Sequence, residues 1–395
     1  MNFRKLNLAL AVALAAAVIP LSSPAQSKEP VKVGLVTSKT GVWAEMGEEV
    51  LRGVHFAIDE ANAQGGVDGR KIEVAEGDDE GNPDAGRRAA EKLAREGYKF
   101  IIGPIGSAVS LAIVQNLDRW DAMYFATISK SDKLTGDTCK MRSFRTVQSD
   151  AMDMAMVASW AKELKGSNFA IIAADYAWGH DSAASFKKAV ESQGKNVPLT
   201  FFAPLGTKDY SPYISQIKEK KVDAIWAAVP ARDGVNLMKQ AGSFNLIPAT
   251  PMLGHAMLST FMINGTGKVQ DGMRGTLGYA PDFNEPRNKA FVAAFQAKFK
   301  RAPSDTEGLA YHGASVMLDG IRLAKSVQPL EVSKALAGAR LDTIFGPVTV
   351  RAEDHQVLIP NFVGRVKVVD GELRPTVEEV FPPSTIPAPS PLCKL

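Results

Sequence analysis

Cysteine and histidine are scarce in this sequence. The 395 residues include two cysteines and five histidines, which are too few and too widely scattered to suggest a zinc site. Charge of one sign is also lacking. The formal net charge is +3, and it falls to about +1 without the first 25 residues, which carry two bases and no acid. This balance argues against a nucleic-acid partner and leaves no polybasic patch for a membrane surface.

Long apolar runs are absent beyond the N-terminal segment. Arg4 and Lys5 precede the Ala-rich apolar stretch 6–21, and Ser-Pro-Ala at 23–25 has the small residues of a cleavage site. These features predict a secretory signal peptide that is cleaved near Ala25, the alternative being a retained membrane anchor. We expect the mature protein to be exported. In an oxidising compartment the two cysteines, Cys139 and Cys393, could form a disulfide, but the sequence leaves open whether they lie close enough.

Two α/β lobes are predicted from the order of apolar segments. About 370 mature residues suit two domains. Strand and helix patterns alternate over 31–126 and again over 168–254, which is typical of parallel sheets covered by helices on both faces. The remaining block is too small for a third domain, so we expect the chain to return to each lobe in turn. The predicted units are 26–146 with 276–346, 147–275 with 347–381, and a Pro-rich tail, 382–395.

The segment 100–116, FIIGPIGSAVSLAIVQN, carries the strongest signal for a ligand site. An apolar strand ends at Ile102, a Gly-Pro loop follows, and Ser107 occupies the expected N-cap of the next helix. Such a junction directs free N–H groups and a hydroxyl toward one point, where a carboxylate or phosphate can bind. The alternative is an ordinary α/β turn that binds nothing.

Ligands of parallel sheets bind beyond the carboxyl ends of the strands. Hydroxyl side chains gather in those loops of the first predicted lobe, and Trp43, Tyr176 and Trp178 supply aromatic rings. This combination suits a small ligand with an anionic end and an apolar body. Dinucleotide, phosphate-loop and nucleophile-elbow motifs are missing, so we predict neither a cofactor nor an enzyme. His255 lies in a candidate cleft loop, as a polar ligand contact or as a structural residue.

The chain resembles the periplasmic leucine/isoleucine/valine-binding protein family, the type I solute-binding proteins of ABC transporters. The resemblance covers residues 31–370 and is most specific at 65–72, GGVDGRKI. It implies two Rossmann-like lobes with parallel central sheets joined by a three-strand hinge that closes on the ligand. It also implies a periplasmic location, a membrane permease as partner and, we expect, a monomer. Other matching segments are 31–35, 38–41, Gly47, 58–62, 78–79, 103–107, 144–146, 178–179 and 345–347.

By this resemblance the ligand carboxylate is held by Ser107 together with groups of Ile128, Ser129 and Lys130. Trp178 covers the ligand from the other lobe. We further predict that Trp43 and Trp178 sandwich the apolar body. These residues, with His255, form the predicted site.

Departures from the family pattern bear on the ligand. Met46 stands where the amino-acid binders have a tyrosine, and Lys130 where they have a threonine. Lys130 either adds charge to the carboxylate site or points to solvent. The acid that receives the ligand ammonium is replaced by His255 or Ala256, and burying an ammonium without an acid is costly. A branched-chain or other hydrophobic amino acid and an amine-free aromatic or branched acid therefore both remain open.

The predicted function is that of an extracytoplasmic substrate-binding protein of an ABC importer. Two other classes remain as alternatives. A ligand-sensing receptor module would pass its closed state to a signalling partner, and a secreted α/β hydrolase would need a nucleophile–base pair that the sequence does not display.

Overall fold

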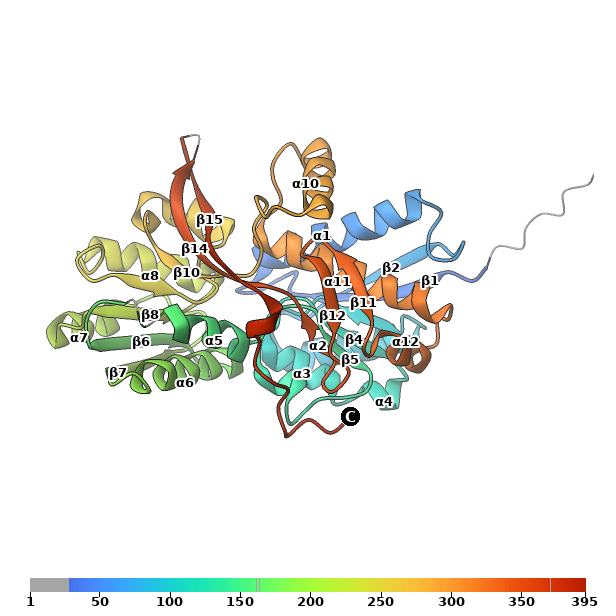
Figure 1. Cartoon of the computed structure of the whole chain (residues 1–395), viewed down its shortest axis with the longest axis horizontal. Helices are drawn as coiled ribbons and strands as arrows, with labels where there is room; N and C mark the ends of the chain where they lie inside the picture. The colour runs from blue at the N-terminus through green and yellow to red at the C-terminus, as the bar shows by residue number, and fades with distance from the viewer. Residues whose placement is uncertain (1–27, 161, 163, 370) are drawn as a thin grey trace, which may run out of the picture.

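Two lobes lie side by side in the computed structural model, which describes residues 28–160, 162, 164–369 and 371–395 (Figure 1). The predicted signal peptide with cleavage near Ala25 lies outside the described residues. Within the described ranges, no helix is both long enough and apolar enough to cross a membrane. Both lobes are α/β with parallel central strands, as the sequence predicted.

The first lobe is built on a five-stranded parallel sheet of order β2-β1-β3-β4-β5. Successive side chains of a strand face opposite sides. Val33 and Leu35 accordingly join the core beneath α1, whereas Val36 joins the core beneath α2 and α3. The strands are β1 (Val31–Thr37), β2 (Ile72–Asp78), β3 (Phe100–Ile102), β4 (Met123–Ala126) and β5 (Ser143–Arg145).

Helices from two distant parts of the chain cover this sheet. The N-terminal helix α1 packs against α11, and Gly53 permits the contact because a Cβ there would lie 2.5 Å from the Glu307 carbonyl oxygen. Phe56 of α1 also meets Phe291 and Phe295 of α10. The helices are α1 (Ala44–Ala63), α2 (Pro83–Arg95), α3 (Ser107–Val114), α4 (Leu117–Trp120), α10 (Pro286–Phe299), α11 (Asp305–Ala324) and α12 (Pro329–Leu336), with a 3-10 turn at Asp132–Thr135.

The second lobe has a seven-stranded sheet of order β15-β14-β10-β9-β8-β6-β7. Five strands are parallel, and β14 and β15 add an antiparallel edge. Helices α5 and α6 pack on one face, and α7, α8 and α9 on the other. The strands are β6 (Asn168–Ala174), β7 (Asn196–Ala203), β8 (Ala224–Ala228), β9 (Met252–Gly254), β10 (Arg274–Leu277), β14 (Asn361–Val369) and β15 (Glu372–Phe381). The helices are α5 (Asp150–Trp160), α6 (Ala177–Glu191), α7 (Ser211–Lys220), α8 (Ala231–Ser243) and α9 (Thr260–Thr266), with 3-10 turns at Gly267–Gln270 and Pro383–Thr385.

Three crossings connect the lobes: after β5 (146–149), after β10 (278–285) and before β14 (359–360). The buried Gln148 joins all three. It lies on the first crossing, and its Nε2 donates to the carbonyl oxygens of Gly278 at 3.1 Å and Pro360 at 2.9 Å. Two carbonyls that would otherwise be buried without a donor are thereby satisfied, and the crossings are held in register.

The return to the second lobe differs from the predicted boundary after residue 346. Strands β11 (Arg340–Thr343), β12 (Gly346–Val350) and β13 (Val357–Leu358) form a separate three-stranded sheet. A bridge between Arg145 and Gln356 joins this sheet to the first lobe. Gly346, with φ of +78°, pairs with Thr343 at the end of a hairpin, so the Gly-Pro pair marks a turn and not a linker. The chain enters the larger sheet only at Asn361.

The C-terminal tail returns to the first lobe. Cys393 forms a disulfide with Cys139, with α-carbons 5.5 Å apart, which resolves the pairing that the sequence left open. Arg351 also donates from Nη1 to the carbonyl oxygen of Pro387 at 2.7 Å. The tail after β15 thus spans from the second lobe to the first.

Candidate functional site

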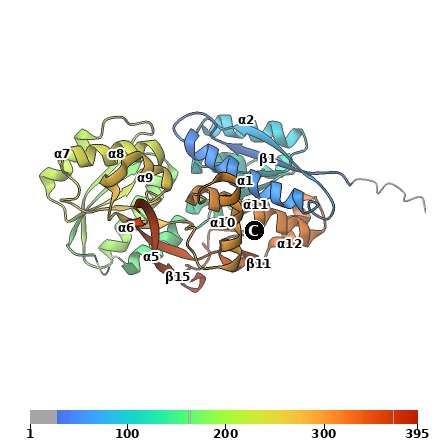
Figure 2. The same cartoon turned by 90° about the horizontal axis from the view of Figure 1, so that it is seen from above.

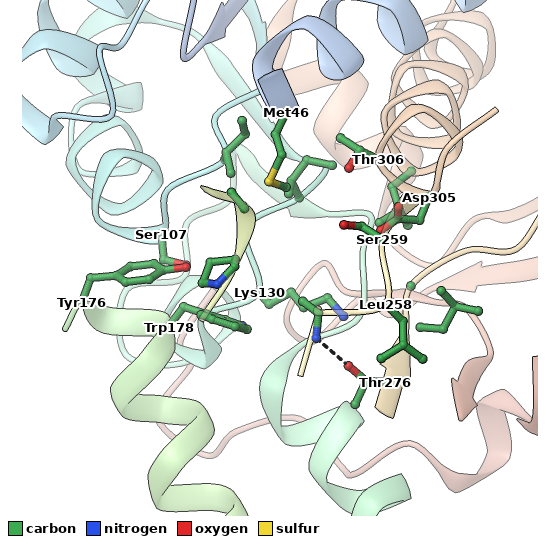
Figure 3. Close-up of a pocket in the computed structure, with 18 residues that line it drawn as sticks. Met46, Ser107, Lys130, Tyr176, Trp178, Leu258, Ser259, Thr276, Asp305 and Thr306 are labelled. Carbon is green, nitrogen blue, oxygen red and sulfur yellow. Dashed lines mark hydrogen bonds between the residues drawn. The ribbon is translucent and has the colours of Figure 1, made fainter. Parts of the chain in front are cut away.

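The two lobes also lie side by side when the molecule is seen from above (Figure 2). A cavity lies between them, beyond the carboxyl ends of strands from both sheets (Figure 3). Its volume is about 750 Å³, including the part that opens to solvent. The first lobe contributes Ser107, Ile128 and Lys130 to the wall, and the second contributes Tyr176, Trp178 and Ser259.

Ser107 reaches the cavity because the chain turns sharply after β3. Gly103 has φ of +111°, and a Cβ there would lie 2.6 Å from Leu35 Cδ1, so only glycine fits this turn. Helix α3 begins at Ser107, and Gly106, with extended backbone, is its N-cap. The prediction of Ser107 as N-cap was therefore wrong by one residue. Ser129 Oγ donates to Ser107 Oγ at 3.1 Å, which leaves the Ser107 proton available to an acceptor in the cavity.

Lys130 is buried and does not point to solvent, so that alternative is excluded. Its Nζ lies 2.6 Å from Asp153 Oδ2, and Asn361 Nδ2 donates to the other Asp153 oxygen at 3.0 Å. Burial pushes the pKa of Asp153 up, but the Lys130 ammonium and His255 outweigh it and leave the pKa below its usual value. Lys130 therefore places a positive charge at the cavity wall, and the negative charge of Asp153 already neutralises it.

His255 lies behind the cavity wall. Its Nδ1 is 2.7 Å from Ser182 Oγ and its Nε2 is 2.9 Å from Asp153 Oδ2. Burial lowers the pKa of His255 in spite of the neighbouring Asp153 carboxylate, so the ring is neutral at neutral pH. The adjacent Ala256 faces the cavity instead. The hydrogen bonds of His255 within the protein fit the structural alternative, and its contact with a ligand stays a prediction.

Asp150, Asp153 and His255 are the one group of three potential metal ligands within the described part of the chain. The Lys130 ammonium already contacts the oxygen of Asp153 that faces His255. Burial, followed by the charges of Asp132 and Asp153, raises the pKa of Asp150 well above its usual value. Because the Lys130 ammonium already pairs with the Asp153 carboxylate, this cluster is poorly suited to a divalent ion.

Three aromatic rings form a row beside the cavity. Tyr176 and Trp178 lie on the wall, with ring centroids 5.7 Å apart. Trp43 packs behind Tyr176 at 5.6 Å and against Gly106, away from the wall. The cavity wall therefore carries Tyr176 and Trp178, both from the second lobe, and not Trp43 of the first lobe. Ile128 lines the cavity as predicted, whereas Ser129 lies behind Ser107. Ligand contacts of all these residues remain predictions.

Asp305 lines the cavity and was not predicted from the sequence. It is the first residue of α11, where Ser304 caps the helix and forms a capping box with Glu307. The Ser-x-x-Glu signature at 304–307 marks this helix start and could have been recognised. The sequence analysis looked for an acid only in the loop of His255, whereas Asp305 reaches the cavity from a returning helix of the first lobe.

The electrostatics of Asp305 are unusual. Burial raises its pKa from the usual 3.8 to about 6, although backbone N–H groups nearby oppose the rise. Its Oδ1 atom is shielded from solvent and has no hydrogen-bond partner among the described residues. In Figure 3, Asp305 lies with Ser259 and Thr306 on the side of the cavity away from Ser107 and Tyr176. The two sides of the cavity thus differ in chemistry.

Two α/β lobes, three crossings and a cavity between facing strand ends define a bilobal ligand-binding protein. Comparisons with known proteins agree. A model of the family described as periplasmic binding protein matches residues 30–372. The chain is 27% identical over 336 residues to the Leu/Ile/Val-binding protein homolog 2 of Brucella abortus, covering 84% of this chain and 88% of that protein.

Solved structures share the fold. A solute-binding protein of an ABC transporter from Rhodopseudomonas palustris, in complex with 3,4-dihydroxy benzoic acid, superimposes with a TM-score of 0.83 at 24% identity, covering 91% of this chain and 99% of that one. The leucine-, isoleucine-, valine-, threonine-, and alanine-binding protein of Brucella ovis, in a closed conformation, gives 0.82 at 22% identity, covering 93% and 99%. The chain belongs to the periplasmic binding protein family, in the type I group that includes the Leu/Ile/Val-binding proteins. It is a binding protein and not an enzyme.

Proposed function

We propose that this protein captures a small hydrophobic carboxylate for an ABC importer and closes around it at the hinge. The observation that carries the proposal is the pair of donors, Ser107 and Lys130, on the wall of a mostly apolar cavity between the lobes. A carboxylate accepts strongly from a hydroxyl and an ammonium, and the rings of Tyr176 and Trp178 offer an apolar surface to the rest of the ligand. The ligand class comprises hydrophobic amino acids and aromatic or branched acids.

Contacts across the mouth of the cleft support hinge closure. Ser131 of the first lobe donates to Asp181 of α6 at 2.7 Å, and Arg232 of α8 forms an ion pair with Glu45 of α1. Because these contacts join lobes that the three crossings allow to rotate, they belong to a closed arrangement. A ligand that touches both walls would favour that arrangement by its differential affinity. The Brucella ovis relative, described in a closed conformation, agrees with this proposal.

A permease in the membrane, a periplasmic location and a monomeric state complete the proposal. The family supports the location, and the predicted signal peptide would direct export. The tail disulfide is also consistent with an oxidising compartment.

Thermal shift of the purified mature protein tests the function directly. We expect the melting temperature to rise in the presence of branched-chain amino acids or of aromatic or branched acids, since a ligand bound only by the folded state stabilises it by mass action. The matching amine, alcohol or amide should produce no rise, because it lacks the anionic group. Stabilisation by sugars or cations in place of acids would contradict the proposal.

Ser107→Ala tests the carboxylate site. We expect the affinity for the stabilising acid to fall about tenfold, as the loss of one hydrogen bond to a charged group predicts. Ser315→Ala is a matched control, since Ser315 is a half-buried helical serine of α11 whose hydroxyl bonds the Tyr311 carbonyl at 2.9 Å. Equal affinities of the two variants would remove Ser107 from the site.

A further inference from the structure

Asp305 is the acid of the cavity that the protein leaves without a partner. Lys130, the cation on the same wall, is engaged by Asp153 at 2.6 Å. Glu307, two residues after Asp305, is balanced by Arg52 and Arg301, each at 2.6 Å. No ion pair of Asp305 occurs among the described residues, and its Oδ1 is both shielded from solvent and unbonded.

Its surroundings compensate the burial only in part, through backbone N–H groups such as that of Thr260 and through the charge of Lys130. Glu49 of α1 lies nearby, and burial followed by the charges of Asp305 and Glu307 raises the pKa of Glu49 to about 8, so that this acid is mostly protonated at neutral pH. Glu49 Oε2 also has no hydrogen-bond partner within the described residues. Ser259 and Thr306, which share this side of the cavity, are neutral hydroxyls. Lys130 is the one cation on the described cavity wall, and it is already paired with Asp153, so this end of the cavity offers Asp305 no cationic partner.

Burying an acceptor without a donor is costly, and the cost persists only where something else supplies the donor. An aspartate in the first turn of a helix interacts favourably with the helix dipole, but an aspartate exposed to solvent would do so equally well. The dipole therefore does not explain why Asp305 is buried. The orientation of Asp305 into a ligand cavity instead matches a residue that completes its hydrogen bonds with the ligand.

We propose that Asp305 receives a hydrogen-bond donor, an ammonium or a hydroxyl, at the end of the ligand remote from its carboxylate. This inference rests on the proposed function, and it narrows the ligand class to acids with polar groups at both ends. Figure 3 separates Ser107 from Asp305 across the cavity, with Lys130 between them. The ammonium of an α-amino acid, one carbon from its carboxylate, would stay at the Ser107 end. A ring or a short chain would carry a donor to the Asp305 end.

A series of matched acids tests this assignment by calorimetry. The probes are para-methylbenzoate, para-hydroxybenzoate and para-(aminomethyl)benzoate, with hexanoate and its ω-hydroxy and ω-amino derivatives as the unbranched series. We expect at least one acid with a distal donor to bind about tenfold to a hundredfold more tightly than its donor-free analogue, the range for a hydrogen bond to a charged group. A preference for the amino over the hydroxyl compound would identify an ammonium, and the reverse a hydroxyl.

Substitutions then assign the preference to Asp305. Asp305→Leu should abolish the preference for a distal donor and leave the donor-free acid bound at least as tightly. Asp305→Asn retains an acceptor and the size of the side chain, so it should weaken the amino compound more than the hydroxyl compound, and it remains informative if the leucine variant does not fold. Asp319→Asn, on the same helix but paired with Arg322 at 2.6 Å, is the control and should leave all affinities unchanged.

The outcomes separate this inference from the proposed function. Equal binding of all acids within a series, or a donor preference that survives in both Asp305 variants, would overturn the role of Asp305 and leave the carboxylate site intact. Failure of every acid to bind, with binding of a different ligand class, would overturn the proposed function and this inference with it.

Discussion

Asp305→Asn should make the ligand-free protein more stable above neutral pH, although the residue lines the binding cavity. The pKa of Asp305 is raised by burial from 3.8 to about 6, so the folded protein holds this proton more tightly than the unfolded chain does. The contribution of the group to stability is complete below the unfolded pKa and is lost as the pH rises through about 6. Above that pH the ionised carboxylate destabilises the fold.

The size of the effect follows from this rise in pKa. A rise from 3.8 to about 6 corresponds to roughly 3 kcal/mol of cost for the ionised form. The partial access of the side chain to water in the cavity reduces this to about 1–2 kcal/mol. Loss of a favourable charge at the start of α11 would subtract about 0.3–1 kcal/mol. Above about pH 6, the free energy of unfolding of Asp305→Asn should therefore exceed that of wild type by about 1 kcal/mol.

Calorimetric melting of wild type and Asp305→Asn across pH measures this difference. For a lobe of this size, 1 kcal/mol moves the melting temperature by about 2–4 °C. We expect the variant to melt higher at about pH 8 and the advantage to disappear below about pH 4, where both side chains are neutral. A variant that melts lower at pH 8, or an advantage that does not depend on pH, would refute the reasoning that Asp305 is buried without compensation.

Three further predictions concern the framework around the site. Cys393→Ser should lower the free energy of unfolding by about 2–5 kcal/mol because the disulfide with Cys139 closes a long loop. Dithiothreitol should lower the melting temperature of wild type but not that of the variant. Equal melting temperatures of oxidised wild type and variant would contradict this prediction. Glu307→Gln should cost about 3 kcal/mol in urea unfolding because it removes the buried acid that pairs with both Arg52 and Arg301. The exposed Glu331→Gln should stay within about 0.5 kcal/mol, and similar costs for the two would argue against a buried ion-pair role. Gln148→Leu should lower the free energy of unfolding by about 1–3 kcal/mol, because it leaves two buried carbonyls of the crossings without a donor. It should also alter ligand affinity, measured by titration, and the shapes of the apo and bound forms, measured by small-angle scattering. Unchanged affinity and scattering would show that the crossings do not need this residue.

The alternation of strands and helices was sufficient to predict both lobes, because parallel sheets impose a strong local pattern. The order of apolar residues in 31–36, for example, already divides Val33 and Leu35 from Val36, and the structure places them in different cores. The path after α12 was not predictable in the same way. The Gly-Pro pair at 346–347 is compatible both with a turn back into the same lobe and with a passage to the other lobe. Only the pairing of β11 with β12 shows that the chain turns back.

The site was predictable where a loop follows its strand directly. Ser107, Ile128 and Lys130 come immediately after β3 and β4, so the parallel sheet brings them together. Side-chain direction within a loop was not predictable: Ala256, with φ of +54°, faces the cavity, while His255 faces the opposite way.

Asp305 required a different kind of information. Its helix start is visible in the sequence at 304–307, but its distance from Ser107 along the chain gives no hint that both meet one cavity. That proximity depends on the crossing after β10, which returns the chain to the first lobe and packs α11 against α1. Local patterns therefore predict the elements, and long-range topology decides which of them share a ligand.

The tail disulfide alters what a single backbone cut can do to this molecule. Cys139 precedes all three crossings and Cys393 follows them, and the two cysteines are 254 positions apart along the chain. A protease that cleaves once anywhere in that interval, even inside a crossing, leaves two pieces that remain covalently joined through sulfur. The nicked protein would migrate as one species without reductant and as two with it, and its two pieces could not diffuse apart.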